Sequence, residues 1–142
     1  MAKLQLISNK KVKAVFDDYE EPVKTKLLDL RELIIETAES IPEISVLEET
    51  LKWGEPSYLT KIGSTIRINS KKSIPGKYAM YFQCTSKLIP TFKIFYKNIF
   101  TFEGNRAIVF DVNKEIAVSE LSKCIACGLT YHKAKNLPML GL

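Results

Sequence analysis

The chain has 142 residues, of which 46% are hydrophobic and 26% are charged. This balance excludes a disordered or fibrous protein, and a chain of this length is expected to form one domain around its own hydrophobic core. The 21 basic and 16 acidic residues give a net charge of +5. Such a mild excess permits weak attraction to phosphates without specifying it.

The cysteines and the apolar segments bear on the cellular compartment. Three cysteines, an odd number, are not the framework of a disulfide-rich secreted domain. Residues 1–8 hold no apolar stretch long enough for a signal peptide, and no window approaches the roughly 20 apolar residues of a membrane span. We therefore expect a cytoplasmic protein with reduced thiols and no membrane association.

Two helices are expected in the N-terminal part. Ser8 or Asn9 can cap a short helix over residues 10–18, and Pro22 suits the first position of a longer one. In this longer helix apolar residues recur at spacings of three and four until Pro42 ends it. They are Val23, Leu27, Leu30, Ile34, Ala38 and Ile41. The opposite face, which is expected to face water, carries Lys24, Asp29, Arg31, Glu32, Glu36 and Glu39.

After Pro42 the spacing of the apolar residues changes to that of strands. The chain is expected to turn at residues 54–56 and again about Gly63, and Pro75 with Gly76 marks a loop. The expected strands cover residues 49–53, 57–62, 64–69 and 77–84.

The C-terminal part predicts a helix, a hairpin and a second helix. The expected segments are a helix that begins near Pro90 and ends at about residue 98, a hairpin over residues 99–103 and 106–111, and a helix between a Ser119 cap and Pro138. The order of segments predicts an α+β fold over residues 1–142. In it the N-terminal helices and a C-terminal helix pack on one face of a twisted, mainly antiparallel sheet of about five to six strands.

The stretch Leu51-Lys52-Trp53-Gly54-Glu55-Pro56-Ser57-Tyr58 is the most distinctive, because it holds the only tryptophan beside a glycine and a proline. With residues 78–82, 102–108, 126–133 and 137–141 it resembles the YdhG-like domains, from about residue 23 to the C-terminus. The resemblance implies a compact bacterial α+β domain, similar in layout to frataxin, in a family whose members mostly have no known function. An iron-chaperone role proposed for one branch is implied as an alternative.

Trp53, Glu55 and Tyr58 are the first candidates for a binding site. A strand broken at residues 54–56 would project the Trp53 ring and the Tyr58 hydroxyl beside one mobile carboxylate. Such an arrangement suits a small cationic or planar ligand. The alternative is that Trp53 packs in the core, as tryptophans usually do, and that the turn only starts the sheet.

Arg67 and Arg106 are the only arginines within the expected strands. If both point to an uncovered sheet face with Tyr81, they could form an anion site, because arginine binds carboxylate or phosphate bidentately. Otherwise they are solvated and paired with nearby acids. The site expected from these observations binds a small anionic or aromatic molecule or a segment of a partner protein. It comprises Trp53, Glu55, Tyr58, Arg67 and Tyr81.

Asp17, Asp18, Glu20 and Glu21 form the densest acidic run. Carboxylate oxygens suit hard metal ions such as iron or calcium, so a frataxin-like iron-binding protein is the alternative function. The same acids would also stabilise the positive end of the following helix.

Residue patterns typical of catalysis or of cofactor binding are not found. Cys124 and Cys127 form a Cys-x-x-Cys pair, but the expected helix cap at Ser119 lies about one turn earlier, so we expect small buried residues rather than a redox or zinc pair. His132, the sole histidine, accompanies no nucleophile motif. We therefore expect neither an enzyme nor a cofactor.

Two further expectations concern partners. Lys71, Lys72 and Lys77 surround a loop but are too few for a nucleic-acid surface, so nucleic acid is not an expected partner. An exposed strand edge over residues 64–69 could mediate self-association, which leaves a homo-oligomer and a structural or interaction module as a third alternative.

Overall fold

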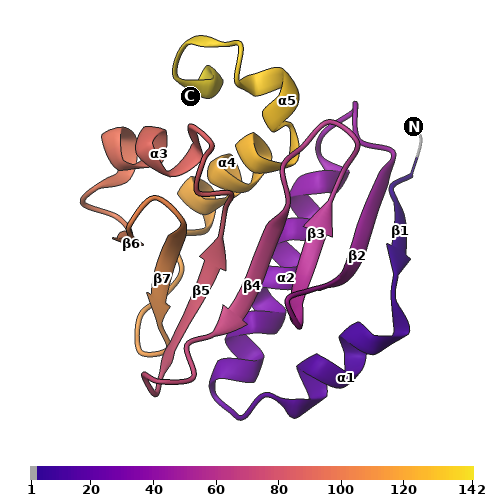
Figure 1. Cartoon of the computed structure of the whole chain (residues 1–142), viewed down its shortest axis with the longest axis vertical. Coiled ribbons are helices and arrows are strands. Elements are labelled where there is room, and N and C mark those ends of the chain that lie inside the picture. The colour runs from indigo at the N-terminus through magenta and orange to yellow at the C-terminus, as the bar shows by residue number, and fades with distance from the viewer. Residues whose placement is uncertain (1–2) are drawn as a thin grey trace.

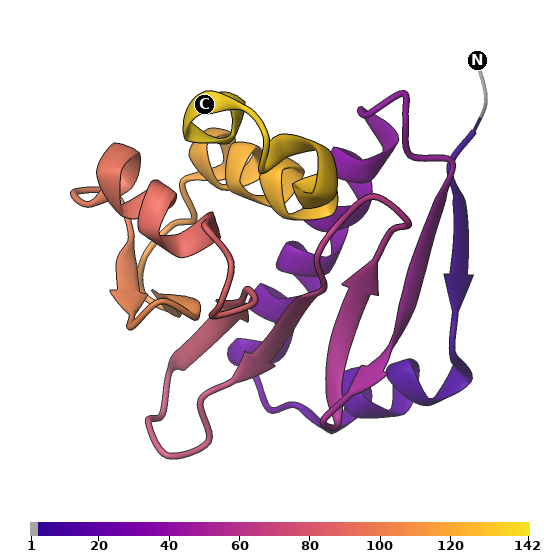
Figure 2. The same cartoon turned by 45° about the horizontal axis from the view of Figure 1, so that its top comes forward.

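A seven-stranded mixed sheet forms the centre of the structure, and helices cover one of its faces (Figures 1 and 2). The computed structural model describes residues 3–142. The strand order is β1-β2-β3-β4-β5-β7-β6; β1 and β2 run parallel, and the other neighbouring pairs are antiparallel. The strands are β1 (Gln5–Ser8), β2 (Val46–Lys52), β3 (Glu55–Leu59), β4 (Ile66–Ser70), β5 (Lys77–Tyr81), β6 (Thr101–Glu103) and β7 (Ala107–Asp111).

The helices are α1 (Lys10–Asp18), α2 (Val23–Glu39), α3 (Leu88–Tyr96), α4 (Val118–Leu129), α5 (Tyr131–Ala134) and the short 3-10 helix η1 (Pro138–Gly141). In Figure 1 α2 lies behind the sheet, α3, α5 and the C-terminus lie at one end of it, and α1 lies at the other end. The predicted α+β fold is confirmed. Within residues 3–142, no helix is both long enough and apolar enough to cross a membrane.

The sheet has more strands than the sequence predicts because β1 is added at one edge. Ser8 of β1 lies beside Glu49 of β2, and both α1 and α2 come between these two residues in the chain. A four-residue strand carries little pattern of its own, and its partner lies far away in the sequence. The sequence prediction omits β1 because its pairing is long-range, and the periodicity of neighbouring residues does not reveal such a pairing.

One helix cap is as predicted and another is not. The side-chain oxygen of Asn9 accepts a hydrogen bond from the backbone N–H of Lys11 at 2.9 Å, which caps α1 as expected. Ser119, in contrast, does not cap α4. This helix begins at Val118 with Ala117 at the N-cap, so Ser119 lies within the first turn.

The loop between β3 and β4 is attached to the C-terminal end of α4. The N–H of Ser64 donates to the carbonyl of Gly128 at 2.9 Å, and the hydroxyl of Thr60 donates to the carbonyl of Leu129 at 2.6 Å. A Cβ atom at Gly63 would lie 2.3 Å from the Leu129 oxygen, so the two backbones approach too closely for any side chain at this position.

Alternation along the strands gives the sheet two different faces. The face toward α2 and α4 carries buried, mainly large apolar side chains: Leu47, Tyr58, Ile66, Ile68, Tyr78, Met80, Ile108 and Phe110. No helix within residues 3–142 covers the other face, which is turned to the viewer in Figure 1. The side chains on this uncovered face include Ser57, Arg67, Ala79, Tyr81, Ala107 and Val109.

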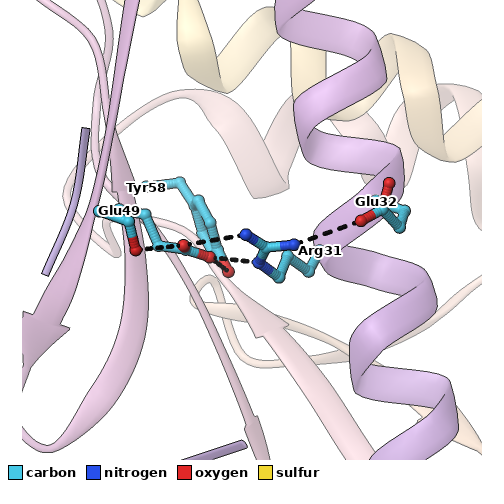
Figure 3. Close-up of polar contacts among 5 residues, drawn as sticks. Arg31, Glu32, Glu49 and Tyr58 are labelled. Atoms are coloured by element: carbon cyan, nitrogen blue, oxygen red, sulfur yellow. Dashed lines mark hydrogen bonds and ion pairs between the residues drawn. The ribbon is translucent and has the colours of Figure 1, made fainter. Parts of the chain in front are cut away.

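One carboxylate lies within the covered side of the sheet. Glu49 of β2 is 1% exposed, and its Oε2 accepts hydrogen bonds from Nε of Arg31 at 2.6 Å and from the hydroxyl of Tyr58 at 2.7 Å (Figure 3). Its Oε1 accepts from the Ser8 hydroxyl at 2.7 Å and from Nη2 of Arg31 at 3.2 Å. One side chain thus joins β1, β2, β3 and α2.

The expectation that Arg31 faces water is wrong for its guanidinium, which turns toward the sheet because Glu49 lies there. Burial by itself would raise the pKa of Glu49, but hydrogen bonds from Arg31, Ser8 and Tyr58 outweigh burial and lower the pKa below its ordinary value. Burial, and then the charge of Glu49, raise the pKa of Tyr58, so this hydroxyl stays protonated and donates.

Replacing Arg31 by Met should lower the free energy of unfolding by about 3 kcal/mol, because Glu49 is left as a buried charge without its cation. Adding Glu49→Gln to Arg31→Met should restore part of that loss, since no buried charge then remains. Urea unfolding followed by circular dichroism measures both values. Glu32→Gln, which changes only the exposed contact of Arg31, is the control and should stay within about 0.5 kcal/mol of the wild type. A double variant less stable than Arg31→Met would contradict this account.

Acid should destabilise the protein partly through Glu49. Because the folded-state pKa of Glu49 lies below its ordinary value of 4.5, the unfolded chain binds more protons than the folded one near and below that pH. The free energy of unfolding should therefore fall as the pH drops from about 5 toward 3, and it should fall less steeply in Glu49→Gln. Denaturant unfolding at pH 7, 5, 4 and 3 gives the two curves. Parallel curves would show that Glu49 contributes no such dependence.

Candidate functional site

The only tryptophan of the chain lies in the turn between β2 and β3. Lys52 and Glu55 form the last pair of this hairpin, so Trp53 and Gly54 alone make the connection. Both have positive φ, 56° for Trp53 and 73° for Gly54. The sequence prediction of a turn over residues 54–56 is therefore wrong by about two residues, and Pro56 belongs to β3.

Trp53 has an unfavourable backbone and an unfavourable environment. Two-residue turns with two positive φ values favour Asn or Gly at the first position, and a bulky residue such as tryptophan is strained there. The Trp53 side chain is also 89% exposed, so its ring gains almost nothing from burial. The alternative that Trp53 packs in the core is thereby excluded.

A groove of about 540 Å³ lies beside this turn. We call it the Trp53 groove; its polar and aromatic lining consists of Asp18, Tyr19, Glu20, Trp53, Asn69, Ser70 and Lys72. The groove lies at the end of the sheet next to α1 and the connection from α1 to α2 (Figure 1). Two features that are separate in the sequence, the tryptophan turn and the acidic run, therefore meet in space.

The four acids of the run have different surroundings. Asp17 accepts a hydrogen bond from Lys13 at 2.7 Å, which lowers the Asp17 pKa. Hydrogen bonds from the hydroxyl and the N–H of Thr25, at 2.8 and 2.9 Å, likewise lower the pKa of Glu21. Neither Asp18 nor Glu20 forms an ion pair with a described residue, and both line the groove. In residues 3–142, no three His, Cys, Asp or Glu side chains are placed to share one metal ion.

A series of hydrogen bonds runs from the groove to the uncovered sheet face. The Tyr19 hydroxyl donates to Oδ1 of Asn69 at 2.8 Å, and Nδ2 of Asn69 donates to Oε2 of Glu55 at 2.8 Å. Arg67 then donates to Oε1 of Glu55. Burial, followed by the charge of Glu55, raises the pKa of Tyr19, which keeps this hydroxyl protonated and donating.

Arg67, Tyr81 and Arg106 come together on the uncovered face. The guanidinium carbons of Arg67 and Arg106 lie 5.4 and 5.3 Å from the centroid of the Tyr81 ring, which is cation–π distance. Each arginine also has a carboxylate nearby: Glu55 binds Arg67, and Glu103 lies 3.9 Å from Arg106. Arg106 remains 56% exposed, whereas Arg67 is 25% exposed.

Tyr58 does not line this surface. It is fully buried on the helix-covered face, where it donates to Glu49. Strand alternation explains the error: Glu55 and Tyr58 lie three positions apart in one strand, so their side chains point to opposite faces. Of the five predicted site residues, Glu55, Arg67 and Tyr81 share the uncovered face, Trp53 lies at the end of the hairpin, and Tyr58 lies in the core.

Sequence reasoning missed two residues of the Trp53 groove, Tyr19 and Asn69. Tyr19 follows Asp18 at the end of α1, where an aromatic residue between two helices indicates a packed linker. Asn69 stands on β4 at a position that faces Glu55 across the hairpin pair. No local pattern marks Asn69, because its role depends on the pairing of β3 with β4.

The remaining candidates for chemistry lie elsewhere. Cys124 and Cys127 are buried in α4, as predicted, and all three cysteines are free. Burial raises the pKa of Cys127 to about 11 and raises that of Cys124 further, so both are neutral thiols. His132 is exposed on α5, at the end of the sheet opposite α1.

No protein-family model, no curated protein and no solved structure matches the chain significantly. The function of the chain therefore has to be inferred from its own residues and their geometry.

Replacing Trp53 by Gly should raise the free energy of unfolding by about 0.5 to 1 kcal/mol, because glycine accepts a positive φ and no buried contact is lost. Thermal and urea unfolding followed by circular dichroism measure this change. Trp53→Val is the matched control and should destabilise the protein, since a β-branched residue is poorly accommodated at positive φ. A loss of stability in Trp53→Gly comparable to that of a core truncation would mean that the ring packs against the protein.

Proposed function

We propose that this protein is a non-catalytic binding protein whose recognition site is the Trp53 groove, where a cationic group of a small molecule or of a protein segment is held. The observation that carries the proposal is the exposed, strained Trp53. An exposed ring at a positive φ lowers stability, and violations of local rules of this kind concentrate at functional positions.

The chemistry of the groove favours a cation. The face of an indole ring attracts a cationic group, and of the aromatic side chains tryptophan does so best. Asp18 and Glu20 add two carboxylates that have no ion-pair partner among the described residues, against one positive charge from Lys72. A cation over the ring of Trp53 would thus meet both attractions at once.

The groove also favours binding over catalysis. Its tyrosine hydroxyl, that of Tyr19, already donates to Asn69 at 2.8 Å, and its pKa is raised away from neutrality. The buried thiols and His132 lie on α4 and α5 rather than beside the groove. The buried thiols and the imidazole are thus too far from the groove to act there as a nucleophile or as a base, which supports binding rather than covalent catalysis.

A second candidate is the binding of a small anion at Arg106, on the uncovered face beside Tyr81. The guanidiniums of Arg67 and Arg106 both contact the Tyr81 ring, and that of Arg106 is the more exposed to solvent. This arrangement favours an anion-binding site. Glu55 pairs with Arg67, and Glu103 is shared between Lys71 at 2.5 Å and Arg106 at 3.9 Å. The two carboxylates offset part of the positive charge, so the candidate is weaker than the Trp53 groove. Membership of the YdhG-like domains and a cytoplasmic location remain proposals, which rest on the sequence resemblance and on the three free cysteines.

The test is a titration of the protein with spermidine and with a short lysine peptide, followed by calorimetry and by the emission of Trp53. As the only tryptophan, Trp53 reports occupancy of its own groove. Binding should shift the emission, and Asp18→Asn with Glu20→Gln should weaken the affinity about fivefold. Calorimetry on Trp53→Gly should show a loss of about five- to tenfold.

Controls separate this proposal from its competitors. Glu36→Gln with Glu39→Gln removes two acids of α2 outside the groove and should leave the affinity unchanged. Binding of phosphate or ATP that is lost in Arg106→Met would favour the second candidate. The iron-binding alternative would be favoured if ferrous iron binds under anaerobic conditions and this binding is lost when four acids are all changed to amides. The four acids are Asp17, Asp18, Glu20 and Glu21. The proposal would be refuted if neither spermidine nor the lysine peptide binds.

A further inference from the structure

A second surface lies at the end of the sheet where α3, α5 and the C-terminus gather, opposite α1 (Figures 1 and 2). Residues 83–99 and 121–142 contain no Asp or Glu. They contain six lysines, which exceed the net charge of +5 of the whole chain: Lys87, Lys93, Lys97, Lys123, Lys133 and Lys135. The mildly basic composition of the protein is therefore concentrated in these segments.

An apolar groove lies within this basic region. It has a volume of about 480 Å³ and lies between α3 and residues 137–142, which we call the C-terminal turn. We call the groove the C-terminal groove. Ile94 of α3 is 62% exposed, and Leu137 and Met139 are 54% and 51% exposed. With Pro90 and Pro138 they form its apolar lining, and Lys87 lies at its edge. Contiguous exposed apolar side chains with a charged rim are typical of a binding surface.

The shape of the groove is built into the C-terminal turn. Met139 and Leu140 both have positive φ, 50° and 57°, which is strained for residues with a side chain. Leu140 is buried, its N–H donates to the Leu137 carbonyl at 3.2 Å, and the Leu142 N–H donates to the Met139 carbonyl at 2.9 Å. The turn thus buries Leu140 while Leu137 and Met139 remain exposed. A preformed groove loses little conformational freedom on binding.

We propose that the C-terminal groove binds an acidic amphipathic segment of a partner protein. The apolar side chains of that segment insert between α3 and the C-terminal turn, and its carboxylates pair with Lys87 and with other lysines of the two acid-free segments. Charge complementarity selects an acidic partner, since no described acid of α3, α5 or the C-terminal turn opposes it. This inference is independent of the proposed function, because the Trp53 groove lies at the other end of the sheet.

The concave form of the surface distinguishes this occupant from other anionic partners. A bilayer takes up apolar side chains that protrude, whereas a groove between two walls takes up the side chains of another protein. Nucleic-acid surfaces for single strands offer aromatic rings for base stacking, and no aromatic residue lines the C-terminal groove.

The test uses a fluorescently labelled peptide of about 15 residues, with leucines at helical spacing on one face and glutamates elsewhere. Fluorescence anisotropy should show binding that weakens as salt is added. The same peptide with lysine in place of glutamate should not bind. Ile94→Ser should weaken binding at least about tenfold, and Lys87→Gln, which removes the lysine of the groove lining, should weaken it about threefold.

Ile74→Ser is the matched control, because Ile74 is 46% exposed in the loop between β4 and β5, outside the C-terminal groove. It and Trp53→Gly should bind the peptide as the wild type does. The proposal is overturned if the glutamate peptide does not bind, or if Ile94→Ser binds it unchanged. It is also overturned if anionic lipid vesicles or single-stranded DNA bind more tightly than the peptide, or if the free protein forms dimers that Ile94→Ser abolishes.

Discussion

The contact between Arg31 and Glu49 determines how the first strands are arranged. A carboxylate on the helix-covered face needs its cation and its hydrogen-bond donors, so Glu49 faces Arg31 and Tyr58 faces Glu49. Glu49 lies directly opposite Tyr58 in the antiparallel pair, and this register leaves two residues for the connection. The tight turn that exposes Trp53, and the uncovered position of Glu55, both follow from a contact made in the core.

The Trp53 groove combines polar groups that are hydrogen-bonded within the protein with exposed groups that have no ion-pair partner among residues 3–142. Tyr19, Asn69, Glu55 and Arg67 form a continuous series of hydrogen bonds, so this wall is already organised before any ligand arrives. An organised wall lowers the entropic cost of binding. The indole ring and the carboxylates of Asp18 and Glu20, which have no ion-pair partner among residues 3–142, are then the groups left to contact the proposed ligand.

Sequence periodicity was sufficient for the elements that depend on near neighbours. The first three helices, the Asn9 cap and the α+β class follow from spacings within a few residues. Features that depend on distant partners were missed or misread: β1, the inward turn of Arg31, and Asn69. The expectation of an exposed strand edge over residues 64–69 is also wrong, because β4 lies inside the sheet between β3 and β5. Within the candidate site, Trp53, Glu55, Arg67 and Tyr81 were identified from residue type. Tyr58 was misplaced because a two-residue error in the turn made the strand alternation unreadable.

The contact between Gly63 and the end of α4 limits how this chain can evolve. With 2.3 Å between a Cβ at Gly63 and the Leu129 oxygen, no side chain fits at this position unless the loop between β3 and β4 moves away from the helix. The turn at Trp53 is limited by its backbone rather than by space: no described atom lies within 4 Å of a Cβ at Gly54, but the positive φ of Gly54 still favours glycine. Side chains of different size therefore have room at the Trp53 turn, whereas the α4 junction accepts only glycine.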